Sequence, residues 1–492
     1  MAGALAARLW GLGRESLWLD EATSLMMACL PIPKLVELTA ADIHPPLYYL
    51  LLHFWRYLGE GEATLRGLSV LGGLLGVGLA FLLGRELFDA ATGLAAAALM
   101  AVAPLHIWYS QEVRGYVWLA AFCLLAMWGL ARWLAVRGRQ RGGGWLGLLA
   151  YVAGVTLALY IHYYTVFVIL ASNAIVLALS VSRVRSSGGA QALTARPSAL
   201  VPWAVAQLLV VVLFLPWLPT FLKLVLGDGG GWVAQAGAPR VQALAATVVS
   251  FIVGGAQPYL PAPVRRLAYA GFMVALGIGL ARGAGLLGGK EGGDERVGVF
   301  QAGVHLVLPL ATAWLISQFR PLYSDRYMLP FLAPFLILVG RGVTALPERW
   351  LRAAALALLL VGPLWATAAQ VRELDNPDWR GLAAELAAAA QPGDVMILVP
   401  GWNDKPLDYY LQGRIPFGEY VPDPVDPAQP ERSLPAVRRT IAGHRRAWLL
   451  WAKGHYTDRT GVVAGYLDRE AKRVQTREVP GVGELILYEL GN

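Results

Sequence analysis

Residues 64–83 read TLRGLSVLGGLLGVGLAFLL, an apolar run in which Arg66 is the one charged side chain. A helix rises about 1.5 Å per residue, so roughly twenty apolar residues cross the ~30 Å hydrocarbon core of a bilayer. Similar runs recur along the chain and predict about ten membrane-spanning helices. Their ranges are 64–83, 92–109, 115–136, 145–161, 163–182, 199–222, 265–283, 299–318, 328–345 and 352–371.

The composition of the whole chain agrees with a polytopic membrane protein. Of its 492 residues, 57% are hydrophobic and 15% are charged, whereas a soluble domain carries about 25% charged residues. The formal net charge of +8 does not indicate nucleic-acid binding, because the basic residues lie largely in short loops between the apolar runs. Cys29 and Cys123 form neither a CxxC motif nor a zinc pattern.

The basic loops predict the orientation of the chain in a cell membrane. Arginines cluster in the loops at 137–141, 183–196 and 349–352, and such loops face the cytoplasm. Alternation then places the loops at 20–21, 111–112, 162–164 and 325–327 on the external side. This alternation of loops between the two sides holds only if the short run 241–254 lies in the membrane interface and does not cross the membrane.

The two ends of the chain differ from the rest. Residues 1–12 are too few to cross a bilayer, and we expect that they are the end of a first span that begins upstream in the natural protein. After residue 374 the apolar runs stop, and residues 375–492 read as a small external α/β domain. In it we expect helices at 382–390 and 462–472 and strands at 395–400, 446–452 and 484–490. The membrane domain is therefore 1–374.

Two short clusters near the N-terminus carry chemistry. Asp20 and Glu21 lie in the first external loop, and His44 begins the sequence HPPLYY. Ionisable groups at a membrane surface are costly and often mark a reaction site. A carboxylate there could take a proton from an attacking hydroxyl group, although the pair could also be a solvated helix cap. His44 could contact a phosphate or a metal ion, or it could simply precede a proline-started helix.

Three further external clusters are candidates for the same site. Gln111, Glu112, Arg114 and Tyr116 occupy a tight turn, which suits a polar substrate or a neutralised hairpin tip. His162 and Tyr163 could be site residues or part of an ordinary aromatic belt. Arg326 and Tyr327 precede a span, where the guanidinium could reach lipid headgroups or clamp a phosphate. The chain has no dinucleotide loop, P-loop, HExxH or nucleophile elbow.

The clusters together resemble a known family. In order, the chain carries an acidic pair, HPPLYY at 44–49, LRGLS at 65–69, GRELF at 84–88, YSQEVRGY at 109–116 and DRYMLPFLAPF at 325–335. Over about residues 9–345 this resembles the GT-C-fold membrane glycosyltransferases, the family that includes protein O-mannosyltransferases and the aminoarabinose transferases of lipid A. The resemblance implies inverting transfer of a hexose or pentose from a polyprenyl-phosphate donor to a protein, lipid or glycan acceptor at the external membrane face.

The resemblance also implies roles for particular residues. Asp20 matches the position of the catalytic base, and Glu112 matches a second acidic position. His44 lies where some relatives carry a lysine that contacts the donor phosphate. We expect donor or phosphate contacts from His44, Arg114, Tyr116, Arg326 and Tyr327, and further site residues in Glu21, Gln111, His162 and Tyr163. A divalent metal ion could bind near Asp20, His44 and Glu112.

Two other classes of function compete with catalysis. A lipid-linked sugar flippase or another transporter would carry ionisable groups near the bilayer midplane, often with internal repeats. Here the charged clusters gather at one predicted face, and no repeat is visible in the spans. A structural or assembly protein would leave the external clusters without a role. The sequence therefore favours an enzyme.

Overall fold

A computed structural model describes residues 1–137, 144–186, 197–227, 238–286, 292–373, 376–421, 425, 428–451 and 457–491. Three arginines that support the expected orientation, Arg139, Arg141 and Arg196, lie outside these ranges. The chain forms two compact units, one of residues 1–12 and 30–374 and the other of residues 13–29 and 375–492. The main part of the second unit begins at residue 375, the domain boundary that the sequence predicted. The unit also includes residues 13–29, the segment that carries Asp20 and Glu21.

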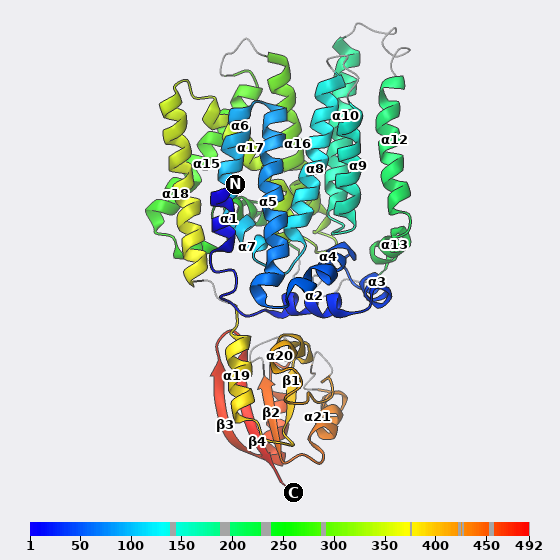
Figure 1. Ribbon diagram of the computed structural model, residues 1–492, viewed down its shortest axis with the longest axis vertical. Helices are drawn as coiled ribbons and strands as arrows, with labels where there is room; N and C mark the ends of the chain where they lie inside the picture. The colour runs from blue at the N-terminus through cyan, green and yellow to red at the C-terminus, as the bar shows by residue number, and fades with distance from the viewer. Residues whose placement is uncertain are drawn as a thin grey trace. The chain divides into compact units, whose positions relative to one another are not determined.

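The first unit is a bundle of apolar helices. Among the described residues seven helices are long and apolar enough to cross a membrane, and Figure 1 shows the long ones side by side. They are α5 (Glu62–Leu87), α8 (Tyr116–Arg137), α10 (Thr165–Ser186), α15 (Ala262–Gly283), α16 (Gly292–Ile316), the η4–α17 segment (Asp325–Thr344) and α18 (Arg349–Glu373). These confirm seven of the predicted spans and the helical membrane fold.

The other three predicted spans are not straight, full-length helices. The run 92–109 forms α6 (Ala90–Ala101) and α7 (Pro104–Ser110), bent by 62°, and the run 199–222 falls in α12 (Pro197–Phe214) and α13 (Leu218–Leu226), bent by 86°. Pro104 and Pro216 lie at these breaks, and proline has no N–H to continue a helix. The run 145–161 forms α9 (Trp145–Leu159), which is shorter than the span criterion.

Shorter helices complete this unit. They are α1 (Ala2–Leu9), α3 (Ile32–Ala41), α4 (Leu47–Trp55), η1 (Arg56–Leu58), α14 (Gln242–Val253) and η3 (Gly254–Tyr259). At 12 residues, α14 is too short to cross a bilayer, which agrees with the interfacial position expected for 241–254.

Small residues let α8 and α9 approach closely. A Cβ atom at Gly129 of α8 would lie 2.5 Å from the carbonyl oxygen of Gly147 in α9, and one at Gly154 would lie 2.6 Å from the amide nitrogen of Ala126. Such positions allow backbone contact between helices in a membrane, where packing is the main attraction. This pair matters for function because the turn before α8 and the loop after α9 both reach the candidate site.

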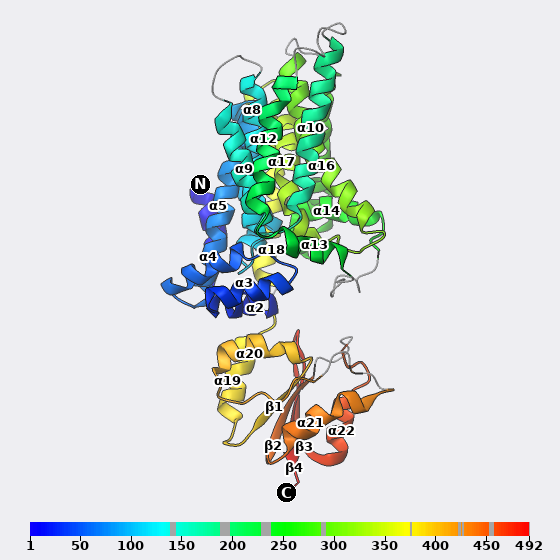
Figure 2. The same cartoon turned by 90° about the vertical axis from the view of Figure 1, so that its right-hand side faces the viewer.

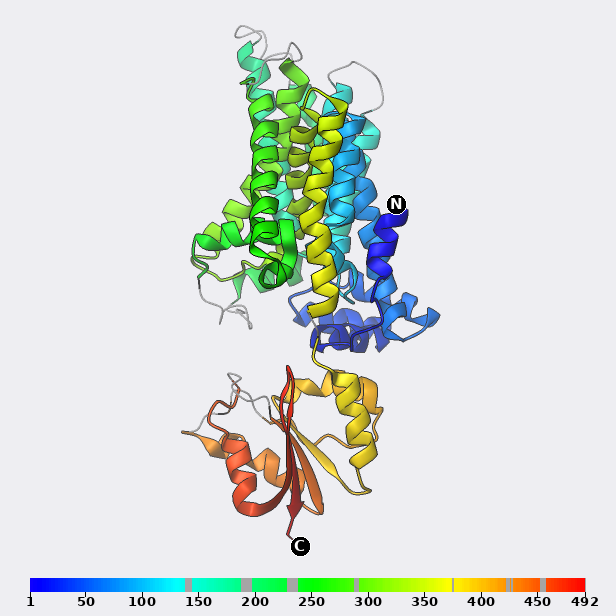
Figure 3. The same ribbon diagram turned by 90° about the vertical axis from the view of Figure 1, so that its left-hand side faces the viewer.

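The second unit is a three-layer α/β domain with one sheet. The strand order is β1 (Val395–Val399), β2 (Arg446–Trp451), β4 (Gly483–Leu490), β3 (Ala471–Val479), with β1 and β2 parallel and the other pairs antiparallel. Figures 2 and 3 show helices on both faces of the sheet. One face is covered by α19 (Trp379–Ala389) and α20 (Asp404–Leu411), and the other by α21 (Leu434–Ile441) and α22 (Val462–Glu470). The 3-10 turns are η5 (Gly401–Asn403) and η6 (Pro430–Arg432).

Alternation along β1 explains why the sheet needs two helical layers. Val395, Ile397 and Val399 belong to the core on one face, whereas Met396 and Leu398 belong to the core on the other. Successive side chains of a strand point to opposite faces, so a strand that is apolar throughout must be covered twice.

The structure corrects the predicted elements of this domain at several points. The helix expected at 462–472 ends at Glu470, and an unforeseen strand, β3, begins at Ala471. All but its ends are exposed, so the apolar alternation that reveals a half-buried strand is missing. The helices α20 and α21 were also not foreseen. The segment before α2 (Leu19–Cys29) joins this unit through the Leu17 amide, which donates to the Tyr410 hydroxyl at 2.8 Å.

Candidate active site

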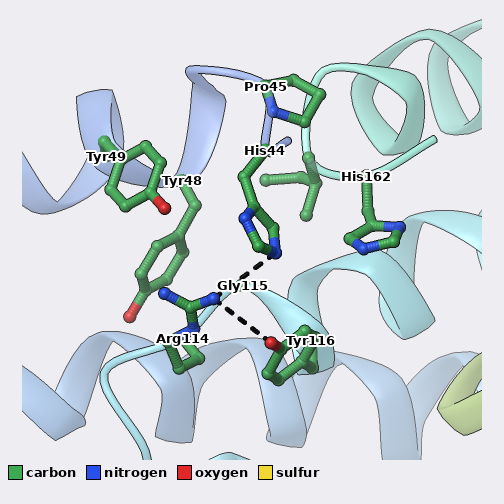
Figure 4. A pocket seen from close by; sticks show the side chains of 9 residues that line it. His44, Pro45, Tyr48, Tyr49, Arg114, Gly115, Tyr116 and His162 are labelled. Atoms are coloured by element: carbon green, nitrogen blue, oxygen red, sulfur yellow. Dashed lines mark hydrogen bonds between the residues drawn. The ribbon is translucent and has the colours of Figure 1, made fainter. Parts of the chain in front are cut away.

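Three predicted clusters of the first unit meet in one pocket. It is lined by His44, Pro45, Tyr48, Tyr49, Arg114, Gly115, Tyr116, Ile161 and His162. Figure 4 shows the Arg114 guanidinium between the imidazole of His44 and the hydroxyl of Tyr116. One guanidinium nitrogen of Arg114 lies 3.4 Å from Nε2 of His44 and donates to the Tyr116 hydroxyl at 3.2 Å.

Local backbone features bring these residues together. The Leu47 amide donates to the carbonyl of Tyr160 at 3.0 Å, which ties the start of α4 to the end of α9. A Cβ atom at Gly115 would lie 3.1 Å from side-chain carbons of Tyr48 and Ile161. That spacing is tight enough that a larger residue would push the turn away. The HPP sequence at 44–46 and Gly115 therefore both allow α4, α8 and α9 to approach one another closely.

A second guanidinium approaches the same tyrosine. Arg326 lies in η4 (Asp325–Phe331) and interacts with Tyr116, Tyr327 and Tyr109. The Tyr327 ring lies 4.5 Å from the His162 ring and 6.0 Å from the Tyr116 ring, centroid to centroid. The structure thus gathers His44, Arg114, Tyr116, His162, Arg326 and Tyr327, as the sequence predicted for a single site.

The pocket has a positive electrostatic character. His162 is buried, and the Tyr164 amide donates to its Nδ1 at 3.2 Å. Burial lowers the pKa of His162 well below its usual value, and the nearby His44, Arg114 and Arg326 lower it further. Burial is the larger cause, and the smaller contribution of the neighbouring cations is the part that suits an anionic ligand.

Asp42 is a member of the site that the sequence analysis missed. Its carboxylate lies 3.8 Å from Nδ1 of His44 and accepts from the Ile43 amide at 2.7 Å. Partial burial would raise the pKa of Asp42, but contacts with His44, the Ile43 amide and Arg114 lower it overall. His44 therefore has a carboxylate at one ring nitrogen and a guanidinium at the other, which fixes its orientation. An acidic residue two positions before the HPP histidine was the available signal.

Glu112 is buried in the turn between α7 and α8. Its carbonyl accepts from the Arg114 amide at 2.8 Å, and its charge acts on Tyr109.

Hydrogen bonds to α14 fix the start of η4, the element that carries Arg326. Asp325 accepts from the hydroxyl groups of Thr247 and Ser250 of α14 at 2.8 and 2.7 Å.

Seven expected residues lie outside this pocket lining: Glu112, Arg326 and Tyr327, described above, and Gln111, Tyr163, Asp20 and Glu21. Gln111 donates from its amide to the carbonyls of Arg8 and Trp10 at 3.0 and 2.8 Å, so it tethers the N-terminal segment. The Tyr163 hydroxyl accepts from Trp217 at 2.9 Å. Asp20 and Glu21 belong to the second unit, in the first turn of α2.

Within the second unit the two acidic residues differ. Glu21 is fully buried, and its carboxylate accepts from the Trp18 amide at 3.3 Å, in the manner of a helix cap. Asp20 is partly exposed, and its carbonyl accepts from the Ser24 hydroxyl at 2.9 Å. Asp20 is thus the member of the pair with a solvent-accessible side chain.

The expected divalent ion finds no ligand set in the described part of the chain. There, no group of three or more His, Cys, Asp or Glu side chains is arranged to hold a metal ion. We therefore derive no chemical step through a metal.

Comparisons with known proteins agree with this architecture. Residues 43–219 match the family model of dolichyl-phosphate-mannose-protein mannosyltransferases. The apo structure of ArnT from Cupriavidus metallidurans matches with a TM-score of 0.63 at 14% identity, covering 99% of this chain and 96% of that one. ArnT bound to undecaprenyl phosphate matches at 0.62, with the same identity and coverage. The arabinofuranosyltransferase AftD from Mycobacteria matches at 0.52 and 13% identity, with 100% of this chain but 40% of AftD covered. No curated protein sequence matches the chain.

These findings define the class of the protein. It is a multi-pass membrane protein with the GT-C fold, the fold of the membrane glycosyltransferases that it matches over nearly its whole length. The family resemblance read from the motifs is confirmed, because the mannosyltransferase family model covers both HPPLYY and QEVRGY. At this level of identity the structural likeness establishes the fold.

Proposed function

We propose that this protein is an inverting glycosyltransferase that moves a sugar from a polyprenyl-phosphate donor to an acceptor hydroxyl group at the external face of a cell membrane. The observation that carries the proposal is the convergence of Arg114, Arg326 and His44 around Tyr116. These donors are suited to the phosphate of such a donor, because a guanidinium can bind phosphate oxygens in a fork.

The reaction requires a stabilised leaving group. The acceptor oxygen bonds to the anomeric carbon while the bond from that carbon to the phosphate oxygen breaks. The electron pair of the broken bond stays on the phosphate, and the polyprenyl phosphate departs. Negative charge thus grows on the phosphate in the transition state, where preorganised N–H donors are most effective. Arg114 and Arg326 would supply them, and the Asp42–His44 pair would orient the Arg114 guanidinium.

The reaction also requires a base for the acceptor proton. By family likeness we assign this role to Asp20, and we assign orientation of the acceptor to Glu112. The partly exposed side chain of Asp20 is compatible with this role, whereas buried Glu21 serves as a helix cap.

The nature of the carrier lipid is supported by a relative. The ArnT structure contains undecaprenyl phosphate, and we infer a polyprenyl carrier of this kind here. A flippase remains the second candidate, because the bent helix pairs α6–α7 and α12–α13 are a feature that transporters share.

Donor cleavage separates these functions. Purified protein in lipid vesicles is incubated with a polyprenyl-phosphate sugar, and release of free polyprenyl phosphate is measured. We expect release that falls in Arg114→Ala and persists in Arg132→Ala. Arg132 is a matched control because it is an arginine of α8, the helix that follows the Arg114 turn. It lies about 24 Å from Tyr116 at the usual helical rise and pairs with Glu86 at 3.4 Å. A donor that crosses the vesicle membrane uncleaved would identify a flippase and refute the proposal.

A further inference from the structure

We propose that Arg8 is a positioning residue of this site. It joins the two sides of the break between α6 and α7, and so it sets the position of the turn that carries Glu112 and Arg114. The inference rests on the proposed function, since it concerns how that site is assembled.

The surroundings of Arg8 are unusual for an arginine in an apolar bundle. Its side chain is fully buried. The guanidinium donates to the carbonyls of Ala4, Ala101 and Met100 at 2.9, 3.0 and 3.3 Å. It also donates to the Ser110 hydroxyl at 3.2 Å and lies 2.7 Å from Nδ1 of His106. A buried charge is costly unless its donors are satisfied, and here its contacts surround it.

The acceptors on α6 are carbonyls that the helix break leaves without their helical partners. In a continuous helix the Met100 carbonyl would accept from residue 104, but Pro104 has no N–H. The 62° bend carries the chain away at the same point. A buried carbonyl without a donor costs stability. Arg8 donates to the Ala101 carbonyl, and it adds a donor to the Met100 carbonyl, which also accepts from the Ala103 amide at 3.4 Å.

The remaining contacts fix α7 itself. His106 and Ser110 are four residues apart and so lie on one face of that helix. The Ser110 hydroxyl donates to the His106 carbonyl at 2.6 Å and accepts from Arg8. On the α5 side, a Cβ atom at Gly73 would lie within 3 Å of both Ser110 Oγ and Arg8 Nε, at 2.2 and 2.9 Å. The cluster fits only because residue 73 is glycine.

The consequence reaches the pocket through the end of α7. This helix ends at Ser110, and the next residue, Gln111, donates to the carbonyls of Arg8 and Trp10. The N-terminal segment therefore holds the last residue of α7 and the first residue of the turn. Glu112 and Arg114 follow at once. A displacement of reacting groups by about 1 Å can cost roughly 10²-fold in rate, so loss of this anchor should impair catalysis.

The test combines local hydrogen exchange with donor cleavage. Arg8→Lys keeps the charge, but one ammonium group cannot reach acceptors on both sides of the break. We expect faster amide exchange in residues 106–114 with unchanged exchange in α15. We also expect kcat/KM for donor cleavage to fall about 10- to 100-fold. Arg132→Lys, the same substitution at the exposed arginine of α8, should change neither quantity.

A milder variant guards against failure of Arg8→Lys to fold. Ser110→Ala removes one contact of the guanidinium and should produce the same local change to a smaller extent. In the double variant, kcat/KM should fall by less than the product of the two single-variant factors, because both substitutions break the same hydrogen-bond network.

Each outcome decides the inference. Wild-type exchange at 106–114 in folded Arg8→Lys protein would overturn it, and so would raised exchange with unchanged cleavage. If the wild-type protein cleaves no donor, the proposed function fails, whereas the exchange measurement still decides whether Arg8 positions the turn.

Discussion

Arg114→Lys tests the phosphate site most directly. The substitution keeps one positive charge in the pocket but removes the planar fork. In the structure one guanidinium nitrogen serves both His44 and Tyr116. A hydrogen bond to a charged group contributes about 1.5–3 kcal/mol. Loss of one such bond from the transition state therefore predicts a fall in kcat/KM of about 10- to 150-fold.

The assay compares release of polyprenyl phosphate by wild type, Arg114→Lys and Arg132→Lys at donor concentrations below KM. Binding of undecaprenyl phosphate is measured in parallel. Because the carrier phosphate is present in both the ground state and the transition state, its affinity should also fall. A folded Arg114→Lys protein with wild-type cleavage and wild-type affinity would refute the assignment of the pocket to phosphate.

Three further predictions concern other parts of the molecule. Asp20→Asn should lower turnover about 10²- to 10⁴-fold without changing thermal unfolding, as expected for loss of a general base; near wild-type transfer by the folded variant would remove Asp20 from the mechanism. Contacts in the folded protein lower the pKa of Asp42. The Asp42 carboxylate therefore stabilises the folded protein above about pH 4. This contribution is lost as the pH falls through the folded-state pKa of Asp42. The difference in Tm between wild type and Asp42→Asn should thus be at most a few degrees at pH 6, since an exposed pair contributes up to about 1 kcal/mol. It should vanish once the pH lies well below the folded-state pKa of Asp42; a difference that stays constant with pH would contradict this. Gly129→Ala places a Cβ 2.5 Å from the Gly147 carbonyl and should destabilise the α8–α9 pair by about 1–3 kcal/mol, seen as a lower Tm; an unchanged Tm would show that the helices can separate at no cost.

The site was visible in the sequence only in part. The motifs at 44–49, 109–116 and 325–327 are unusual as local patterns, because charged and polar groups interrupt otherwise apolar surroundings. Their assembly around Tyr116 could be expected only through the family likeness. Asp42 was missed because acids are common in exposed loops, and its position two residues before the HPP histidine is a weak signal. Arg8 was missed because its partner Ser110 is 102 positions away.

In the second unit, too, the sequence revealed some elements and not others. Strands β1, β2 and β4 and the helices α19 and α22 were expected, because buried strands and amphipathic helices carry their period in the sequence. The exposed edge strand β3 carries no such period. Its place beside β4 is a matter of backbone pairing between distant residues.

By itself the sequence determined that this protein is a helical membrane protein with an α/β domain, since apolar length and side-chain period are local properties that water and lipid impose on each segment separately. Only the tertiary structure decided the 62° angle between α6 and α7, which face each apolar helix presents, and which cations share the pocket. A helix that is apolar all round carries little information about its own rotation. That rotation is chosen by close contacts between distant segments, such as Gly129 with Gly147 and Arg8 with Ser110.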